Sequence, residues 1–288
     1  MFCIMITLAD NTLSLSLFEP GEDGSRYHGT RFDHAGDFAG ILFRGTDYAQ
    51  QWFETYNPLA HDAIGGPAEE FSPIFLPDGR FIKIGVGILE MPSGGQYDHL
   101  LLYPVSDPGR RSLQSDGSSA TFTHEVEGWY NYSKTVRLEG DGRFSILHRL
   151  TASGKHCLSG NVYNHNFFTL GHTVTGPERR IDFPFRPSGH WRSEYDSVAL
   201  SGNGIRFSRE LQKGESVYMG DLVPAEGEKR EYRLSISEGS RGVDISSDAP
   251  LHHIAFWANH RIACPEPFNL FDIKPAESLA WRLDYKLH

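Results

Sequence analysis

Residues 164–170 read NHNFFTL and place one histidine, His165, between two amides and next to two phenylalanines. Imidazole exchanges a proton near neutral pH more readily than any other side chain with an ordinary pKa. Two interpretations fit this context. His165 is either a hydrogen-bonded histidine of a core strand, or the group that trades a proton with the ring oxygen of a sugar in a pocket held by aromatic rings.

A candidate proton partner, Glu266, follows about 100 residues later, between two prolines and after an apolar stretch. This setting constrains the carboxylate, so Glu266 differs from a mobile surface acid. A carboxylate and a histidine form a natural acid–base pair, because burial raises the pKa of the carboxylate towards that of the histidine. Each group must come within about 2.6–3.2 Å of its target oxygen.

Further polar residues lie in the N-terminal half. Residues 61–73, HDAIGGPAEEFSP, contain adjacent carboxylates, Glu69 and Glu70. In a strand these point to opposite faces, so only one can face a pocket, and Glu70 is the candidate. Arg31 and Asp33 lie in the aromatic, turn-rich stretch YHGTRFDH, where Arg31 either contacts a ligand or pairs with Asp33 or another strand neighbour.

The sequence contains no recognisable motif for a metal site or a cofactor site. The three cysteines are odd in number and widely spaced, which fits neither a disulfide framework nor a zinc motif. His252 and His253 would point to opposite faces of a strand and could not share an ion. The glycines of GRFIKIGVG lack the helix and the lysine of a phosphate loop. We therefore expect no cofactor, and activity without a metal.

The formal net charge of −10 and the absence of a Lys/Arg-rich run argue against nucleic acid and anionic membranes as partners. No apolar run approaches the roughly 20 residues of a membrane-spanning helix. The opening residues lack the basic region of a signal peptide. We expect a cytoplasmic protein that binds a small-molecule sugar, and the sequence leaves its oligomeric state open.

Period-two alternation dominates the chain and predicts half-buried antiparallel strands. The alternating apolar-face positions are Leu13, Leu15, Leu17, Phe144, Ile146, His148, Leu150, Tyr232, Leu234, Ile236, Val243, Ile245, Trp281, Leu283, Tyr285 and Leu287. Turn signals recur at short intervals, and only residues 46–56 suggest a short helix. Residues 79–89 read as one long strand, in which Lys83 either reaches into a pocket or lies at its rim, the preferred interpretation. The pattern predicts an all-β protein with one large sandwich or barrel domain over residues 1–288.

Two anchors resemble the aldose 1-epimerases, also called galactose mutarotases. The first is Tyr130 and Tyr132, a strand pair, the turn at 151–154 and then residues 164–170, where Thr169 replaces the usual asparagine. The second is Glu266-Pro267 followed by the turn Pro275-Ala276-Glu277, in which Ala276 replaces the usual glycine. Residues 241–250 resemble the family's strand that ends in Thr-Asp-x-Pro. The resemblance covers roughly residues 125–288.

The resemblance implies a large antiparallel β-sandwich of the galactose-mutarotase type. It also implies a reaction, the exchange of α and β anomers of a sugar, with Glu266 as general base and His165 as general acid. Arg31 and Asp221 take the places of sugar-binding residues, although Asp221 also fits an ordinary turn or strand-end aspartate.

The remaining predicted sugar contacts are Asp33, His61, Glu70 and Asn164. The family's His-Gly-Gly motif is incomplete, since His61 lies four residues before Gly65. This departure suggests a divergent member with its own substrate. The alternatives are a non-catalytic carbohydrate-binding protein on the same scaffold and an accessory domain of a carbohydrate lyase or hydrolase.

Overall fold

The computed structural model describes residues 5–19, 27–60 and 63–288, and these residues contain β-strands but no helix. All strand pairs are antiparallel, so the expected all-β architecture is confirmed. Within the described residues, no helical segment has the length and apolar character needed to cross a membrane.

The larger sheet has ten strands, in the order β10-β11-β12-β13-β24-β21-β20-β15-β18-β17. Their bounds are β10 Arg110–Ser115, β11 Ser119–Val126, β12 Tyr130–Gly140, β13 Arg143–Ala152, β15 Arg179–Asp182, β17 Val198–Ser201, β18 Gly204–Phe207, β20 Arg233–Glu238, β21 Arg241–Ser247 and β24 Ser278–Leu287. Its most extensive pairings join β12 to β13 and β13 to β24, so the last strand of the chain enters the middle of the sheet.

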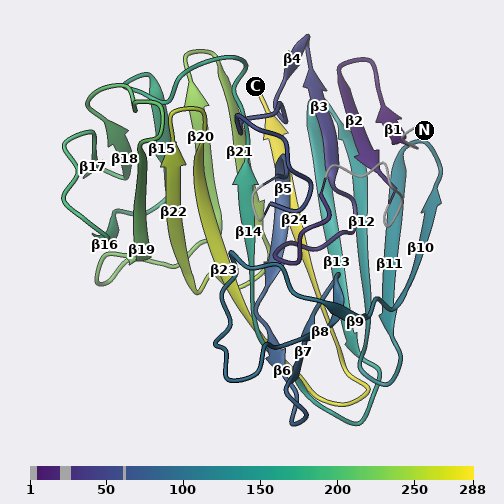
Figure 1. Cartoon of the computed structure of the whole chain (residues 1–288). Coiled ribbons are helices and arrows are strands. Elements are labelled where there is room, and N and C mark those ends of the chain that lie inside the picture. Colours follow the sequence, from purple (N-terminus) through teal and green to yellow (C-terminus); the bar gives the residue numbers. More distant parts are fainter. Residues whose placement is uncertain (1–4, 20–26, 61–62) are drawn as a thin grey trace.

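The second sheet has six strands, in the order β16-β19-β22-β23-β14-β5. Their bounds are β5 Gly66–Phe71, β14 Leu158–Phe167, β16 Pro187–Trp191, β19 Ser216–Pro224, β22 His253–Asn259 and β23 Ala263–Ile273. Strands from the N-terminal part, the middle and the C-terminal part of the chain therefore lie side by side in this sheet (Figure 1).

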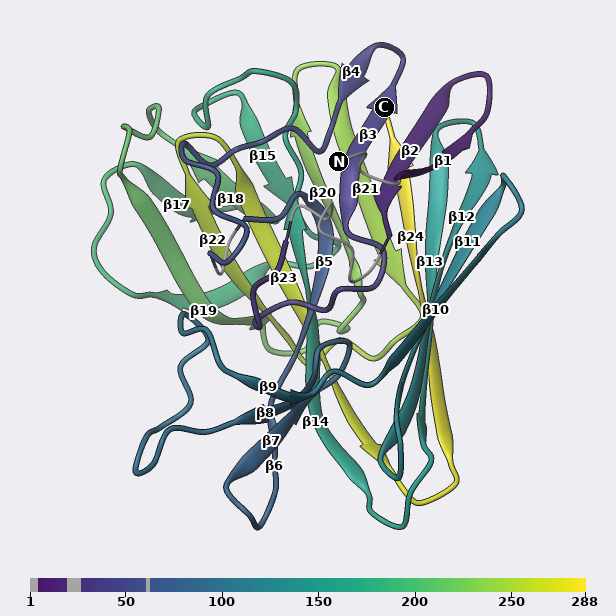
Figure 2. The same ribbon diagram turned by 45° about the vertical axis from the view of Figure 1, so that its right-hand side comes forward.

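Two four-stranded sheets complete the fold. The first contains β1 Met5–Ala9, β2 Leu13–Phe18, β3 Phe38–Phe43 and β4 Thr46–Asp47. The second contains β6 Ile74–Phe75, β7 Arg80–Lys83, β8 Gly87–Glu90 and β9 Val105–Asp107. This second sheet, which we call the β6–β9 lobe, projects below the six-stranded sheet (Figure 2). It has a small apolar cluster of its own around Phe81, Leu89 and Tyr103.

The main core lies between the two large sheets. Every alternating apolar-face residue predicted from the sequence is at most 5% exposed, so those assignments are confirmed. Each strand of the six-stranded sheet contributes one face to this core. Phe71 of β5, Val162 of β14, Met219 of β19 and Phe256 of β22 all belong to the core cluster. The opposite face of the same sheet carries a second apolar cluster, in which Phe32 and Trp52 pack against Phe167 of β14.

Two local predictions were wrong. Residues 46–56 contain β4 and irregular chain instead of a helix. In this irregular conformation Trp52 packs in a buried apolar cluster with Phe32 and Phe167. Residues 79–89 form the hairpin β7–β8 instead of one strand. The chain reverses at Gly85 and Gly87, whose φ values are +81° and +140°, a region that glycine adopts without steric cost.

Candidate active site

The site lies on the outer face of the six-stranded sheet. Side chains alternate along β14, so Tyr163, His165 and Phe167 share one face, while Asn164 and Asn166 point the other way. The last pair of the ladder between β14 and β23 is Tyr163 with Phe268, and Phe268 is the neighbour of Pro267 in the chain. Proline has no N–H to donate, so the regular pairing stops next to the histidine.

His165 and Glu266 meet at this interruption. Nε2 of His165 lies 3.1 Å from Oε1 of Glu266. Both residues are buried, with 3% and 5% of their surface exposed. The structure therefore brings together the two groups that the sequence nominated for acid–base chemistry.

Aromatic rings surround the imidazole. Phe167 stacks on the His165 ring with centroids 3.7 Å apart, and Phe32 meets it edge-on at 5.8 Å. Burial lowers the pKa of His165 below its ordinary value, although the Glu266 carboxylate offsets part of this change. Nδ1 of His165 is buried without a hydrogen-bond partner among the described residues. The neutral tautomer with its proton on Nε2 donates to Glu266. The other tautomer would place a buried N–H on Nδ1 without an acceptor, which is costly.

Strand β22 lies beside Glu266 in the sheet. Ala255 stands opposite Glu266 and adds only a methyl group to the sheet face. His253 and Trp257 flank Ala255 on the same strand and are partly exposed, unlike Glu266 itself. The small side chain of Ala255 therefore stands beside Glu266 between two partly exposed rings.

Strand β19 has a β-bulge opposite Ala255 of β22. Met219 and Leu222 are both fully buried, because Gly220 and Asp221 together stand opposite the single residue Ala255. Asp221 has a φ of +50°, and its side chain is 90% exposed. Strict alternation from Met219 would turn Asp221 into the core, and the bulge turns it to the face of Glu266 instead.

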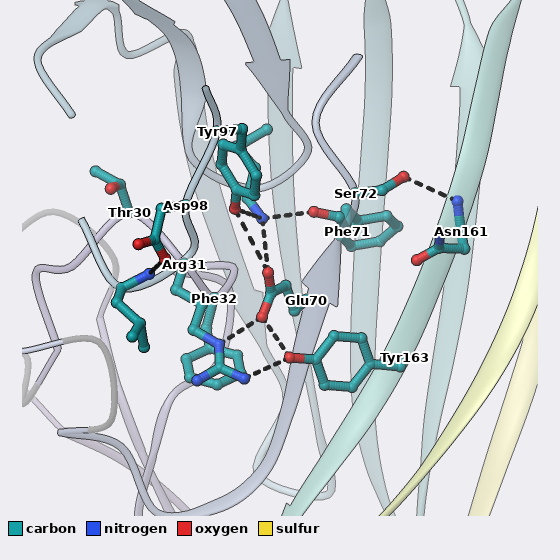
Figure 3. A network of polar contacts seen from close by, with 12 residues as sticks. Thr30, Arg31, Phe32, Glu70, Phe71, Ser72, Tyr97, Asp98, Asn161 and Tyr163 are labelled. Carbon is teal, nitrogen blue, oxygen red and sulfur yellow. Dashed lines mark hydrogen bonds and ion pairs between the residues drawn. The ribbon is translucent and has the colours of Figure 1, made fainter. Parts of the chain in front are cut away.

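Arg31 reaches the other side of the site. Its Nε donates to Oε2 of Glu70 at 2.5 Å, and its Nη2 donates to the hydroxyl of Tyr163 at 2.6 Å (Figure 3). The sequence left open whether Arg31 pairs with Asp33 or with another neighbour, and the partner is Glu70. Burial lowers the pKa of Arg31, but Tyr163, Glu70 and Glu266 together outweigh this effect and raise the pKa above its ordinary value.

A second polar cluster lies behind the sheet. Glu69 accepts hydrogen bonds from Lys134 and, at 2.9 Å, from Asn164. Asn164 in turn accepts a hydrogen bond from Tyr285 of the ten-stranded sheet at 2.7 Å. Asp33 accepts a hydrogen bond from Tyr132 of that sheet, which also belongs to the main core, at 2.8 Å.

Asp33 and Asn164 are therefore corrections to the predicted sugar contacts. Both side chains are buried between the two sheets, on the face of the six-stranded sheet opposite His165. Glu70 does share the face of His165, as expected from its alternation with Glu69. His61 lies outside the described residues. Asp221 stands at the rim of the site, where its Oδ1 lies 3.9 Å from Nε2 of His253.

Lys83 is another correction, since it is fully buried beneath Glu70 and not at a rim. The site face also carries three rings that were not predicted from the sequence: Tyr163, Tyr218 and Trp257. Tyr163 could have been found, because it precedes His165 by two positions in the same strand. Tyr218 and Trp257 carry no comparable local signal.

No group of three or more potential metal-ligating side chains occurs among residues 5–19, 27–60 and 63–288. The prediction that His252 and His253 point to opposite faces of a strand was nevertheless wrong. His252 precedes β22 and is not held on the opposite face, so the Nδ1 atoms of the two rings lie 2.7 Å apart.

Comparison with solved structures identifies the architecture. A galactose mutarotase-like protein from Lactobacillus casei matches with a TM-score of 0.59 and 13% identity, over 99% of this chain and 100% of that one. The chain has the galactose-mutarotase-like fold. A galactose mutarotase related enzyme from Lactobacillus acidophilus matches with a TM-score of 0.60 and 12% identity, over 99% and 97% of the two chains.

An aldose epimerase homologue from C. elegans matches equally broadly, with a TM-score of 0.58, 13% identity and coverage of 100% and 99%. No protein-family model matches the sequence, and no curated protein does. The galactose-mutarotase-like fold is thus retained at an identity so low that it carries no information on activity.

Proposed function

We propose that the protein is an aldose 1-epimerase-like enzyme, which interconverts the α and β anomers of a sugar without a cofactor. The observation that carries this proposal is the contact of 3.1 Å between His165 and Glu266 on the outer face of the six-stranded sheet. Mutarotation needs one group that accepts a proton and one that donates a proton, both at oxygens bonded to the same carbon. Two side chains this close can each reach one of those oxygens.

In the proposed reaction Glu266 removes the proton from the anomeric hydroxyl, and protonated His165 donates a proton to the ring oxygen. The C1–O5 bond breaks and O1 becomes a carbonyl oxygen. After rotation about C1–C2, the ring oxygen attacks the other face of C1. Glu266 returns its proton to O1 and His165 recovers its own from O5, so both groups end as they began.

The neighbouring residues are assigned to sugar binding. Three of the five N–H groups of the Arg31 guanidinium have no partner among the described residues, so they are available to sugar oxygens. Asp221 offers an exposed carboxylate on the far side of Glu266. Trp257 and His253 supply ring faces on which a pyranose can stack.

Saturation-transfer NMR between the anomers of a panel of monosaccharides tests the proposal. We expect exchange well above the buffer rate, and a loss of about 10²–10⁴-fold in Glu266→Gln, the usual contribution of one acid–base group. Glu277→Gln, an exposed glutamate in the turn before β24, is the matched control. Sugar binding without added exchange in the unmodified protein would instead support a non-catalytic carbohydrate-binding protein.

A further inference from the structure

Four donors converge on the carboxylate of Glu70 (Figure 3). Oε2 accepts hydrogen bonds from Arg31 Nε at 2.5 Å and from the hydroxyl of Tyr163. Oε1 accepts from Lys83 Nζ at 3.4 Å and from the hydroxyl of Tyr97 at 3.5 Å. A carboxylate offers about four lone-pair positions, so these donors leave Glu70 no free acceptor for a sugar hydroxyl.

The charges around Glu70 keep it ionised. Burial by itself raises the pKa of Glu70, but Lys83 and Arg31 outweigh this effect and hold the pKa at about 2. Lys83 is fully buried, and its ammonium also donates to the carbonyl of Phe71 at 2.5 Å. With one buried cation already compensating it, Glu70 is a permanent anion in contact with Arg31.

The contacts of Arg31 define the orientation of its guanidinium. Nε is bonded to Glu70, and Nη2 is bonded to Tyr163, whose own hydroxyl donates to the same carboxylate. The guanidinium also lies over the ring of Phe32, 4.7 Å from its centroid. Two hydrogen bonds to one edge fix the plane of the group and leave the opposite edge free.

We propose that Glu70 is a positioning residue, which orients Arg31 towards the substrate without touching the sugar, and that Lys83 serves as its permanent counter-ion. This inference rests on the proposed function of the site. It assigns two buried charges whose role the acid–base mechanism leaves open. An arginine held in one orientation before binding loses less freedom when the sugar arrives, so the benefit appears in affinity.

The test separates orientation from simple structural support. In Glu70→Gln the neutral amide should leave Arg31 mobile, and KM for a monosaccharide should rise about 10-fold while kcat changes less than about 3-fold. Arg31→Ala should raise KM similarly, and the double variant should be no worse than Arg31→Ala alone, because both changes remove the same contact. Glu90→Gln, an exposed glutamate of the β6–β9 lobe, is the matched control.

Glu70→Gln leaves Lys83 buried without a counter-ion and could unfold the protein, so a second variant is needed. Glu70→Gln/Lys83→Met removes both charges and should recover the melting temperature. A positioning role predicts that KM stays raised in this variant, whereas a purely structural role predicts a return to the wild-type KM. A return to the wild-type KM would overturn the proposal.

A second readout needs no sugar. In protein labelled with ¹⁵N-arginine, the Nε–H signal of Arg31, assigned by its absence in Arg31→Lys, should exchange slowly with water in the wild type. It should move towards the signals of exposed arginines in both Glu70 variants. An unchanged signal would overturn the positioning role, even if the wild-type protein proved unable to exchange anomers, a result that would count against the proposed function alone.

Discussion

The imidazole of His165 and the carboxylate of Glu266 are 3.1 Å apart on strands that are distant in sequence and adjacent in the sheet. Both groups are almost entirely withdrawn from solvent, and the second ring nitrogen of His165 has no partner among the described residues. The two side chains therefore stand ready to act on the same small group of atoms.

The pH dependence of anomer exchange should reflect the burial of His165. Burial lowers the pKa of His165 below 6.5, so the protonated imidazole, the proposed acid, is lost as the pH rises through this lowered value. We expect kcat to be higher at pH 5.5 than at pH 7.5 and to fall by up to about tenfold per pH unit above that pKa. Exchange rates measured by NMR and corrected for buffer catalysis test this.

The matching variant is His165→Asn. It should reduce exchange by about 10²–10⁴-fold and abolish the decline at rising pH. Near-wild-type turnover in this variant, or a decline that persists unchanged, would remove the acid role from His165.

Asp33 should make stability depend on pH. Burial, with the charge of Glu69, raises the pKa of Asp33 to about 7 despite the nearby Lys134. A raised folded-state pKa gives stability that is present below the unfolded value of about 3.9 and is lost as the pH rises through 7. Between pH 5 and 7, the free energy of unfolding of the wild type should therefore fall by about 2 kcal/mol relative to that of Asp33→Asn, which cannot ionise. Urea unfolding at several pH values measures both.

Comparison with Asp33→Asn cancels the other titrating groups. Burial lowers the pKa of His148 and of His165, which changes stability in the opposite direction over the same pH range, but equally in both proteins. The pKa of Glu69, at about 2, lies below the window. Parallel stability curves for the two proteins would show that Asp33 is ionised throughout.

Ala276 occupies a position suited to glycine. Its φ is +66° in the turn between β23 and β24, and its N–H donates to the carbonyl of Ala152 at 2.8 Å. This conformation costs a residue with a Cβ about 1–2 kcal/mol in the folded state, and glycine avoids this cost. Glycine also makes the unfolded chain more flexible, which offsets about 0.5–1 kcal/mol of the gain. Ala276→Gly should therefore stabilise the protein by up to about 1 kcal/mol in urea unfolding.

Ala280→Gly is the control for this substitution. Ala280 is also exposed but lies within β24 with an ordinary backbone conformation. Glycine there should destabilise the protein by about 0.5–1 kcal/mol. Equal effects of the two substitutions would contradict the turn argument.

Asp221→Asn tests the rim of the site. Asparagine tolerates the same backbone conformation but carries no charge. Because the side chain is 90% exposed, thermal stability should not change, whereas the loss of a charge-assisted hydrogen bond should raise KM about 3–10-fold. Steady-state kinetics with one monosaccharide measure this. An unchanged KM would reduce Asp221 to a residue that merely accommodates the bulge.

Local pattern was enough to predict much of this protein. A strand alternates its side chains whatever it pairs with, so the sequence already separated Glu69 from Glu70 and defined the buried faces of β2, β13 and β24. The prolines around Glu266 likewise marked a constrained carboxylate.

Long-range pairing decided the rest. Which face of β14 meets the core depends on its pairing with β23 and β5. The sequence around His165 does not contain this information, so the prediction placed Asn164 in the site although it faces the core. The bulge that exposes Asp221 arises from its register with β22, and Lys83 is buried because Glu70 compensates its charge. Register and charge pairing involve residues far apart in the chain, and no short stretch of sequence contains them.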